Sequence, residues 1–175
     1  MMRRLMLLRH AKTERAAPGE RDRDRKLTDR GRTDAPLIGG YMVRHRLVPE
    51  LALVSPATRS EQTWALVGAA FSKTPRAVKE AAIYNATPDT LIDLVSRTQD
   101  ARSLLVVGHN PGLHELARLL IASGDVEARE RLNENLPTSG LVVIDLPLDD
   151  WSDLRANSGR LERFVSPRLI AEATD

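Results

Sequence analysis

The chain has 175 residues, of which 42% are hydrophobic and 29% charged, as in globular proteins, so wholesale disorder is excluded. Lys and Arg exceed Asp and Glu by a net charge of only +2, and the 3% of aromatic residues leaves few rings to stack on bases, so we expect no nucleic-acid partner. The absence of cysteine excludes disulfides and thiolate metal sites. No apolar run approaches the roughly 20 residues of a membrane span, and the run after Met1 is too short for a signal-peptide core. We expect a cytoplasmic monomer with one domain over residues 1–175.

Three short apolar runs are each followed by a cationic or imidazole side chain. Residues 5–8, 51–54 and 104–107 are too short for ordinary helices and are typical of buried strands. The side chains that follow these runs are, in chain order, Arg9 and His10, Arg59, and His109. Because the carboxyl ends of parallel strands line the ligand crevice of an open α/β sheet, the four side chains are expected to converge on one pocket. Two guanidinium groups and two imidazoles suit an anion.

The segment 13–26 follows the first strand and contains no large apolar residue. Connections of this length without structure of their own are usually functional, so we expect it to form a rim of the pocket; the alternative is a solvated loop without a role. Thr28 predicts the N-cap of a helix that runs to about Arg46. Gly39 and Gly40 weaken this prediction, since each glycine costs roughly 1 kcal/mol relative to alanine.

The second strand leads into a helix predicted over residues 57–72, with Arg59 in its first turn. A cation is poorly placed at the positive end of a helix dipole, which indicates that an anion or a carboxylate lies close to it. Glu61 is the simplest candidate for a surface partner of Arg59. Residues 77–78 predict a short third strand.

The later elements follow similar signals. Thr87, Pro88 and Asp89 combine an N-cap, a first-turn proline and a first-turn acid, which predicts a helix with an apolar face over residues 91–95. The other expected elements are a strand over 103–107, a charged surface helix over 126–136, a strand over 141–144 and an edge strand over 160–165. Strands that alternate with helices predict a three-layer α/β fold, with a largely parallel central sheet flanked by helices.

Asn110 and Pro111 predict the start of a further helix that runs to about Ala122, with Asn110 as its cap. His109 then lies beside free helix N–H groups, which favour an anion. We interpret His45, in a charged helix end, as structural, and His114 as a surface residue.

The residue spacing does not indicate a metal site, a nucleotide-binding site or a serine nucleophile. There is no HExxH motif and no cluster of acids near the histidines to hold a metal, and no glycine-rich nucleotide motif. Ser55 and Ser139 lie outside a G-x-S-x-G elbow. What remains is a histidine nucleophile that attacks phosphorus, while two arginines and a second histidine bind the equatorial oxygens where transition-state charge develops.

Four stretches of the chain, in this order, resemble a known family. They are Leu-Leu-Arg9-His10-Ala-Lys12, Lys26-Leu-Thr-Asp-Arg-Gly31, Ser55-Pro-Ala-Thr-Arg59-Ser-Glu-Gln-Thr63 and Val-Gly-His109-Asn-Pro-Gly112. The set resembles the histidine phosphatase superfamily and, more narrowly, the small SixA-type phosphohistidine phosphatases, from residue 5 to about residue 145.

The resemblance implies a phosphoglycerate mutase-like fold, no metal and no cofactor. It also implies that His10 accepts the phosphoryl group covalently, and that Arg9, Arg59 and His109 complete the phosphate pocket. His10 would have to attack as a neutral imidazole, which a reference pKa of about 6.5 permits at neutral pH. Asn110 either adds a donor to the substrate or serves only as a helix cap.

One departure from the family bears on the substrate. Many larger members carry a glutamate after the third strand as general acid for an alkoxide leaving group, whereas residues 79–85 offer no motif-matched acid, and Glu80 is only the nearest candidate. An imidazole leaving group is less basic and can take its proton from solvent. We therefore expect a histidine-phosphorylated protein as substrate and partner. The alternatives are a broader small-molecule phosphomonoesterase and a non-catalytic phosphate-binding module on the same fold.

Overall fold

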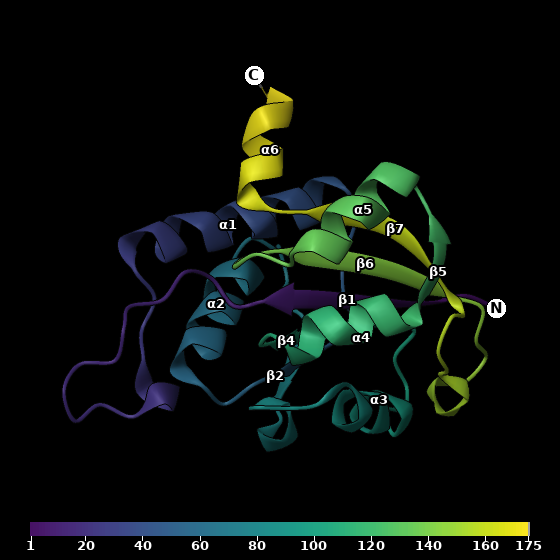
Figure 1. Cartoon of the computed structure of the whole chain (residues 1–175), viewed down its shortest axis with the longest axis horizontal. Helices are drawn as coiled ribbons and strands as arrows, with labels where there is room; N and C mark the ends of the chain where they lie inside the picture. Colours follow the sequence, from purple (N-terminus) through teal and green to yellow (C-terminus); the bar gives the residue numbers. More distant parts are fainter. Residues whose placement is uncertain (175) are drawn as a thin grey trace.

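A central sheet of seven strands crosses the computed structural model, which describes residues 1–174 (Figure 1). The strand order across the sheet is β3 (Arg76–Lys79), β2 (Leu51–Val54), β4 (Ser103–Gly108), β1 (Arg3–Arg9), β6 (Leu141–Leu146), β7 (Gly159–Val165) and β5 (Ile121–Gly124). Only β6, among the strands of these residues, runs antiparallel to its neighbours. The prediction of a largely parallel sheet is confirmed.

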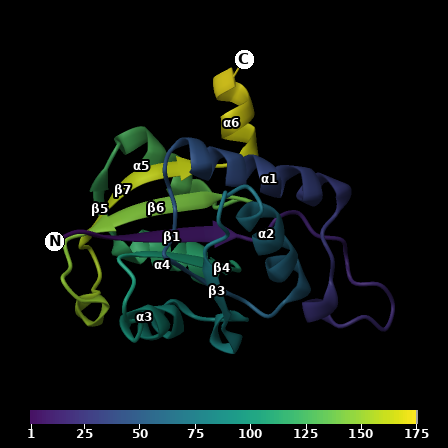
Figure 2. The ribbon, with the colours of Figure 1, turned by 180° about the vertical axis from the view of Figure 1, so that it is seen from behind.

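Helices cover both faces of the sheet, as Figures 1 and 2 show from opposite sides. One face carries α1 (Asp29–Arg44) and α2 (Thr58–Gly68), and the other carries α3 (Pro88–Ser96), α4 (Gly112–Leu120) and α5 (Val126–Glu134). A sixth helix, α6 (Pro167–Thr174), projects from the body at the end of the described chain in both views; it was not predicted. The three-layer architecture is as expected.

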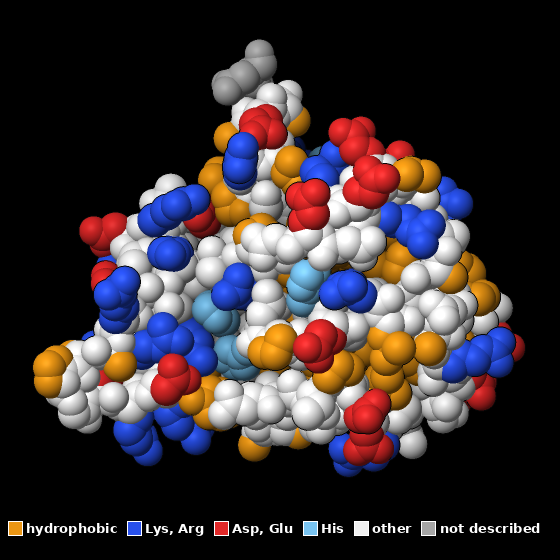
Figure 3. All heavy atoms as spheres, in the orientation of Figure 1, with side chains coloured by type: hydrophobic (Ala, Val, Ile, Leu, Met, Phe, Trp, Pro, Cys, Tyr) orange, Lys and Arg blue, Asp and Glu red, His pale blue; other side chains and the backbone are white. Residues whose placement is uncertain are grey.

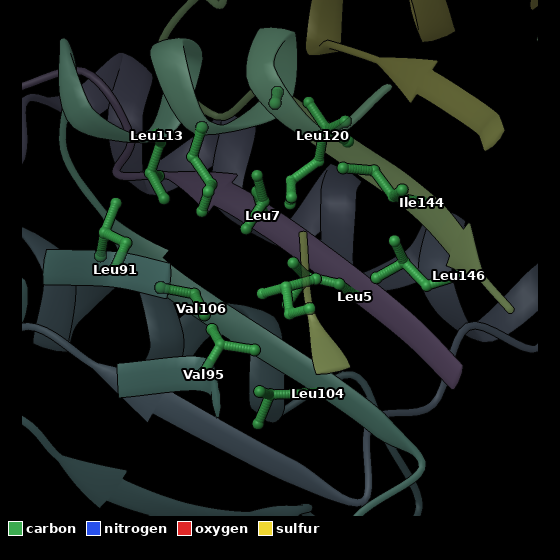
Figure 4. Packing of buried hydrophobic residues seen from close by; sticks show 14 of the residues in the cluster. Leu5, Leu7, Leu91, Val95, Leu104, Val106, Leu113, Leu120, Ile144 and Leu146 are labelled. Atoms are coloured by element: carbon green, nitrogen blue, oxygen red, sulfur yellow. The ribbon is translucent and has the colours of Figure 1, made fainter. Parts of the chain in front are cut away.

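The central strand β1 explains why its apolar residues form one unbroken run. Leu5 and Leu7 face the helices α3 and α4, whereas Met6 and Leu8 face α1 and α2, and all four side chains are fully buried. Figure 4 shows Leu5 and Leu7 among the leucines and valines of the first of these cores. A strand buried on both faces needs apolar residues at every position, so no alternation is visible in the sequence.

Two predicted helix starts are confirmed by their caps. The Thr28 side chain accepts a hydrogen bond from the backbone N–H of Gly31 at 3.0 Å, and Thr87 accepts one from Thr90 at 3.2 Å. The helices α1, α2 and α5 end two to four residues earlier than predicted, as expected for boundaries inferred from periodicity.

The helix predicted to run to Ala122 ends earlier, and residues 121–124 form the strand β5 instead. Strand β5 pairs parallel to β7, with Ile121 opposite Gly159, so β5 is at the edge of the sheet and the prediction that β7 is an edge strand is wrong. The free backbone groups of β7 offer hydrogen-bond partners that a local helical pattern cannot reveal, and Gly124 at φ +131° adopts a backbone conformation unsuited to a helix.

No helix within residues 1–174 combines the length and apolarity needed to cross a membrane.

Candidate active site

The sheet order brings three strand ends together, because β2, β4 and β1 are successive parallel neighbours. Arg9 ends β1 and His10 follows it, His109 follows β4, and Arg59 lies in the first turn of α2 after β2. The ring centroids of His10 and His109 lie 5.3 Å apart. The face in Figure 3 carries pale-blue histidine side chains beside blue cationic ones. The expected convergence at the carboxyl edge of the sheet is present.

His10 is held in one orientation and one tautomer. Its ring nitrogen Nδ1 lies 2.8 Å from the carbonyl oxygen of Ala11, which can only accept, so Nδ1 carries the proton and Nε2 keeps its lone pair. The side chain is 7% exposed. Burial lowers the pKa of His10 to about 3, the bond to Ala11 opposes this shift, and the positive charges of Arg59 and Arg9 reinforce it. The imidazole is therefore neutral at pH 7, as a nucleophile requires.

The backbone around His10 is locked by long-range bonds. The His10 N–H donates to the carbonyl of Gly108 at 3.1 Å, and the next N–H, of Ala11, donates to the Thr63 hydroxyl at 2.9 Å. The Ser139 N–H lies 3.1 Å from the carbonyl oxygens of both Arg9 and His10. Strand β4, helix α2 and the turn before β6 thus all position the nucleophile candidate.

His109 is oriented by Ser55, which follows β2. Its Nε2 lies 2.7 Å from the Ser55 hydroxyl, which itself accepts the N–H of Ala57 at 3.3 Å. This arrangement leaves the hydroxyl proton for Nε2 and favours a proton on Nδ1, which is buried and has no hydrogen-bond partner within residues 1–174. Burial lowers the pKa of His109 to about 4, and the positive charge of Arg59 acts in the same direction. His109 is therefore a neutral N–H donor.

The two arginines are tethered at some nitrogens and unpaired at others. Arg9 donates from one terminal nitrogen to the carbonyl of Leu136 at 3.1 Å. Arg59 donates to the backbone oxygen of Asp22 at 2.8 Å and to its carboxylate at 3.1 Å. The Nε of each arginine is buried without a partner among the described residues. Unpaired buried donors gathered at one site have the chemistry that a polyatomic anion such as phosphate satisfies.

A carboxylate does lie beside Arg59, as its unfavourable place at the helix start indicated, but the simplest candidate, Glu61, is not that partner. Glu61 instead bonds to Lys79 at 2.7 Å, and the carboxylate beside Arg59 is that of Asp22, from the loop 13–26. Residues two apart on a helix do not face each other, whereas the loop folds back over the start of α2. The expected contact of this loop with the site is therefore present.

Asn110 does not cap α4, so that prediction is also wrong. Its side-chain amide donates to the carbonyl of Leu136 at 2.8 Å, Pro111 holds the cap position without a side-chain bond, and the Asn110–Pro111 peptide is cis. The Leu136 carbonyl also accepts a hydrogen bond from Arg9, so Asn110 and Arg9 share one acceptor that is distant in the sequence. Its Oδ1 is buried and has no partner in the described chain.

The remaining candidates lie elsewhere. Glu80 is half-buried and lines a surface hollow with Leu51, Leu53 and Leu94, and none of the four site residues contributes to that lining. His114, interpreted as a surface residue, is half-buried, and its Nε2 contacts the carbonyl of Leu132. His45 is exposed and packs on Tyr41. No group of three or more His, Asp or Glu within residues 1–174 is placed to hold a metal ion.

Two side chains at the site, Asp22 and Tyr84, were not anticipated. The Tyr84 hydroxyl donates to the Asp22 carboxylate, and the Tyr84 ring meets His109 edge-on at 5.5 Å between centroids. The bond from Tyr84, together with the charge of Arg59, lowers the pKa of Asp22 to about 2. Asp22 is one of several acids in a polar loop and Tyr84 belongs to no periodic pattern, so no sequence signal distinguishes them.

Comparison with known proteins agrees with this geometry. Residues 5–82 match the model of the histidine phosphatase superfamily (branch 1). An uncharacterized protein of Mycobacterium tuberculosis is 37% identical over 165 residues, which cover 92% of this chain and 100% of that protein. The chain belongs to the histidine phosphatase superfamily.

Two solved structures that resemble this chain carry the SixA name. The structure of a protein from Agrobacterium tumefaciens that carries the name phosphohistidine phosphatase SixA matches with 34% identity and a TM-score of 0.81, over 94% of this chain and 98% of that one. A protein of the same name from Nakamurella multipartitia matches with 25% identity and a TM-score of 0.82, over 95% and 97%. The expected phosphoglycerate mutase-like α/β fold is confirmed, and the family supports a phosphatase that acts on phosphorylated substrates.

Proposed function

We propose that the protein hydrolyses phosphohistidine on a protein substrate through a covalent phospho-His10 intermediate. The observation that carries this proposal is the state of His10, a neutral imidazole with its Nε2 lone pair available, 5.3 Å from the ring of His109. Nε2 attacks phosphorus, the P–N bond to the substrate breaks, and the departing imidazole takes a proton from solvent. Water then attacks phospho-His10 and releases inorganic phosphate, which restores the neutral histidine.

The other site residues supply donors to the transferred phosphoryl group. Arg9 and Arg59 each keep N–H groups beyond those tethered to the protein, and His109 offers Nδ1–H. These groups are oriented before the substrate arrives, so they stabilise charge on the equatorial oxygens without reorganisation. Asn110 donates one amide proton to Leu136, and the second is left for the substrate.

The leaving group decides the substrate class. An alkoxide requires a proton in the transition state, and a positioned general acid contributes about 10²–10⁴ in rate. The ionised Asp22 cannot provide that proton at neutral pH, and Glu80 lines a different hollow. Imidazole leaves without such help, so phosphohistidine is favoured over phosphoserine or 3-phosphoglycerate.

The test compares initial rates on p-nitrophenyl phosphate, a histidine-phosphorylated protein, phosphoserine and 3-phosphoglycerate. We expect phosphohistidine to exceed the two alkyl phosphates in kcat/KM by at least about 10²–10⁴. His10→Ala should abolish turnover of every substrate, with retention of less than about a tenth of wild-type activity as the criterion. His45→Ala is the matched control because His45 is exposed and packs on Tyr41, and it should keep full activity. Activity should also survive EDTA.

Each alternative makes a different prediction. Comparable rates on phosphoserine, together with a large loss in Glu80→Gln, would indicate a broader phosphomonoesterase that uses a general acid. Equal background turnover by wild type and His10→Ala would indicate a phosphate-binding module that performs no catalysis.

A further inference from the structure

The loop before α1 places a carboxylate on the edge of Arg59 that is farthest from its backbone. Arg59 donates from Nη1 to the main-chain oxygen of Asp22 at 2.8 Å, and from Nη2 to the carboxylate at 3.1 Å. These two nitrogens form the end of the guanidinium plane. The adjacent side edge, made by Nε–H and the second proton of Nη2, has no acceptor recorded at Nε within residues 1–174. Asp22 therefore engages one edge of the fork, and Nε on the other edge has no protein partner within residues 1–174.

Asp22 is itself held from two further directions. Its Oδ2 also accepts the hydroxyl of Tyr84, and its Oδ1 accepts Nε of Arg25 at 2.9 Å. Arg25 in turn donates to the Thr13 hydroxyl at 2.9 Å and to the carbonyl of Glu14 at 3.2 Å, at the start of the same loop. The loop is thus closed on itself through Arg25.

The residue that directly follows this loop, Leu27, attaches it to α2, the helix that carries Arg59. The N–H of Leu27 donates to the side chain of Gln62 at 2.9 Å, and Leu27 is buried. Asp22, although half-exposed, is consequently a fixed point from which the Arg59 guanidinium is oriented.

We propose that Asp22 is a positioning residue that acts through Arg59, so that the phosphate pocket reaches its working geometry only when the loop 13–26 is docked. The proposal rests on phosphoryl transfer at this site. An arginine has several rotatable bonds, and a guanidinium that is free to swing loses the alignment with two oxygens on which bidentate recognition depends. The two contacts from Asp22 remove that freedom before the substrate binds. Charged donors stabilise a transition state most when they are already oriented in this way.

A double-mutant cycle tests the proposal. Asp22→Ala, Arg59→Ala and the double variant are compared in kcat and KM on p-nitrophenyl phosphate and in affinity for orthovanadate, whose five-coordinate form resembles the transition state. Asp22→Ala should lower kcat and vanadate affinity by about tenfold or more in the wild type, but by less than about twofold in the Arg59→Ala background, since a residue that acts through another has no effect once that other is absent.

Asp24 provides the matched control. It lies in the same short 3-10 helix, Asp22–Asp24, but its one ion pair within the described residues is with the exposed Arg21, so Asp24→Ala should retain wild-type kcat and vanadate affinity. Asp22→Asn keeps an oxygen acceptor for Arg59 and should recover part of the loss, and Tyr84→Phe should produce a smaller loss that disappears in the Asp22→Ala background. Melting temperatures of all variants establish that the fold is retained.

Three results would overturn the proposal. These are equal effects of Asp22→Ala and Asp24→Ala, losses from Asp22→Ala and Arg59→Ala that multiply in the double variant, and no change in either kcat or vanadate affinity in Asp22→Ala. If the wild type turned over no substrate, the proposed function would fail while the vanadate affinities would still decide the role of Asp22.

Discussion

At the scale of single residues, the site contains buried cationic and imidazole groups. Burying such groups costs free energy, and specific contacts offset this cost. Arg59 is only 4% exposed, and an unpaired buried charge would be strongly destabilising. Asp22 compensates one edge of the guanidinium, and the remaining N–H groups suit a phosphoryl group. The planar fork of arginine is thus used twice, once by the protein and once by the proposed substrate.

This double use predicts that lysine cannot replace Arg59. Arg59→Ala should reduce kcat/KM on p-nitrophenyl phosphate by roughly 10²–10³, the scale of one lost transition-state contact. Arg59→Lys should recover only part of this loss, because one ammonium group cannot contact the main-chain oxygen and the carboxylate of Asp22 as well as two phosphate oxygens. Arg97→Ala, which removes an exposed surface pair with Asp93, is the control and should have no effect. Full activity in Arg59→Lys would contradict bidentate binding.

At the scale of elements, the position of α2 relative to α1 sets where Arg59 lies. The two adjacent glycines of α1 have different environments. A Cβ atom at Gly39 would lie 2.7 Å from the carbonyl oxygen of Val67 in α2, whereas one at Gly40 would meet only the flexible end of Arg44 at 3.4 Å. Gly39 therefore permits the close approach of the helices, and Gly40 has no such role.

The difference predicts stability changes of opposite sign. Gly39→Ala should lower the free energy of unfolding, because the α2 backbone would have to move away. Gly40→Ala should raise it by about 0.5–1 kcal/mol, the helix propensity of alanine over glycine. Urea denaturation of the two variants measures both effects. Equal changes in the two variants would show that helix packing does not distinguish the positions.

At the scale of the whole molecule, the two buried histidines link folding to pH. In the native state the pKa values of His10 and His109 lie near 3 and 4, and in the unfolded chain both return to about 6.5. Between these limits the unfolded state binds more protons than the native state, so stability falls as the pH is lowered. Above about pH 6.5 both states hold neutral imidazoles, and these groups contribute no pH dependence.

We therefore expect the free energy of unfolding to decrease from pH 7 to pH 5, with a slope of up to about 1.4 kcal/mol per pH unit for each histidine. His10→Ala should have a smaller slope over this interval, and the exposed His45→Ala should keep that of the wild type. Urea denaturation at a series of pH values provides the measurement. An unchanged slope in His10→Ala would mean that His10 is not buried as a neutral group.

The amino-acid sequence by itself determined the features that depend on local chemistry. The unbroken apolar runs showed which strands are buried on both faces, and Thr28 and Thr87 marked helix starts through bonds to residues three positions away. The order of the four family stretches indicated the superfamily, and the strand-end rule indicated that Arg9, His10, Arg59 and His109 would meet.

Only the tertiary structure decided which groups are partners across long separations. Asp22 and Arg59 are 37 residues apart, Asn110 and Leu136 are 26 apart, and the strand β5 exists because β7 offers it a free edge. A polar side chain has many partners of suitable chemistry in the sequence, such as Glu61 for Arg59. The choice among them depends on how the loops close and on which backbone groups remain unpaired after the sheet and helices have formed. Local sequence patterns indicate neither of these.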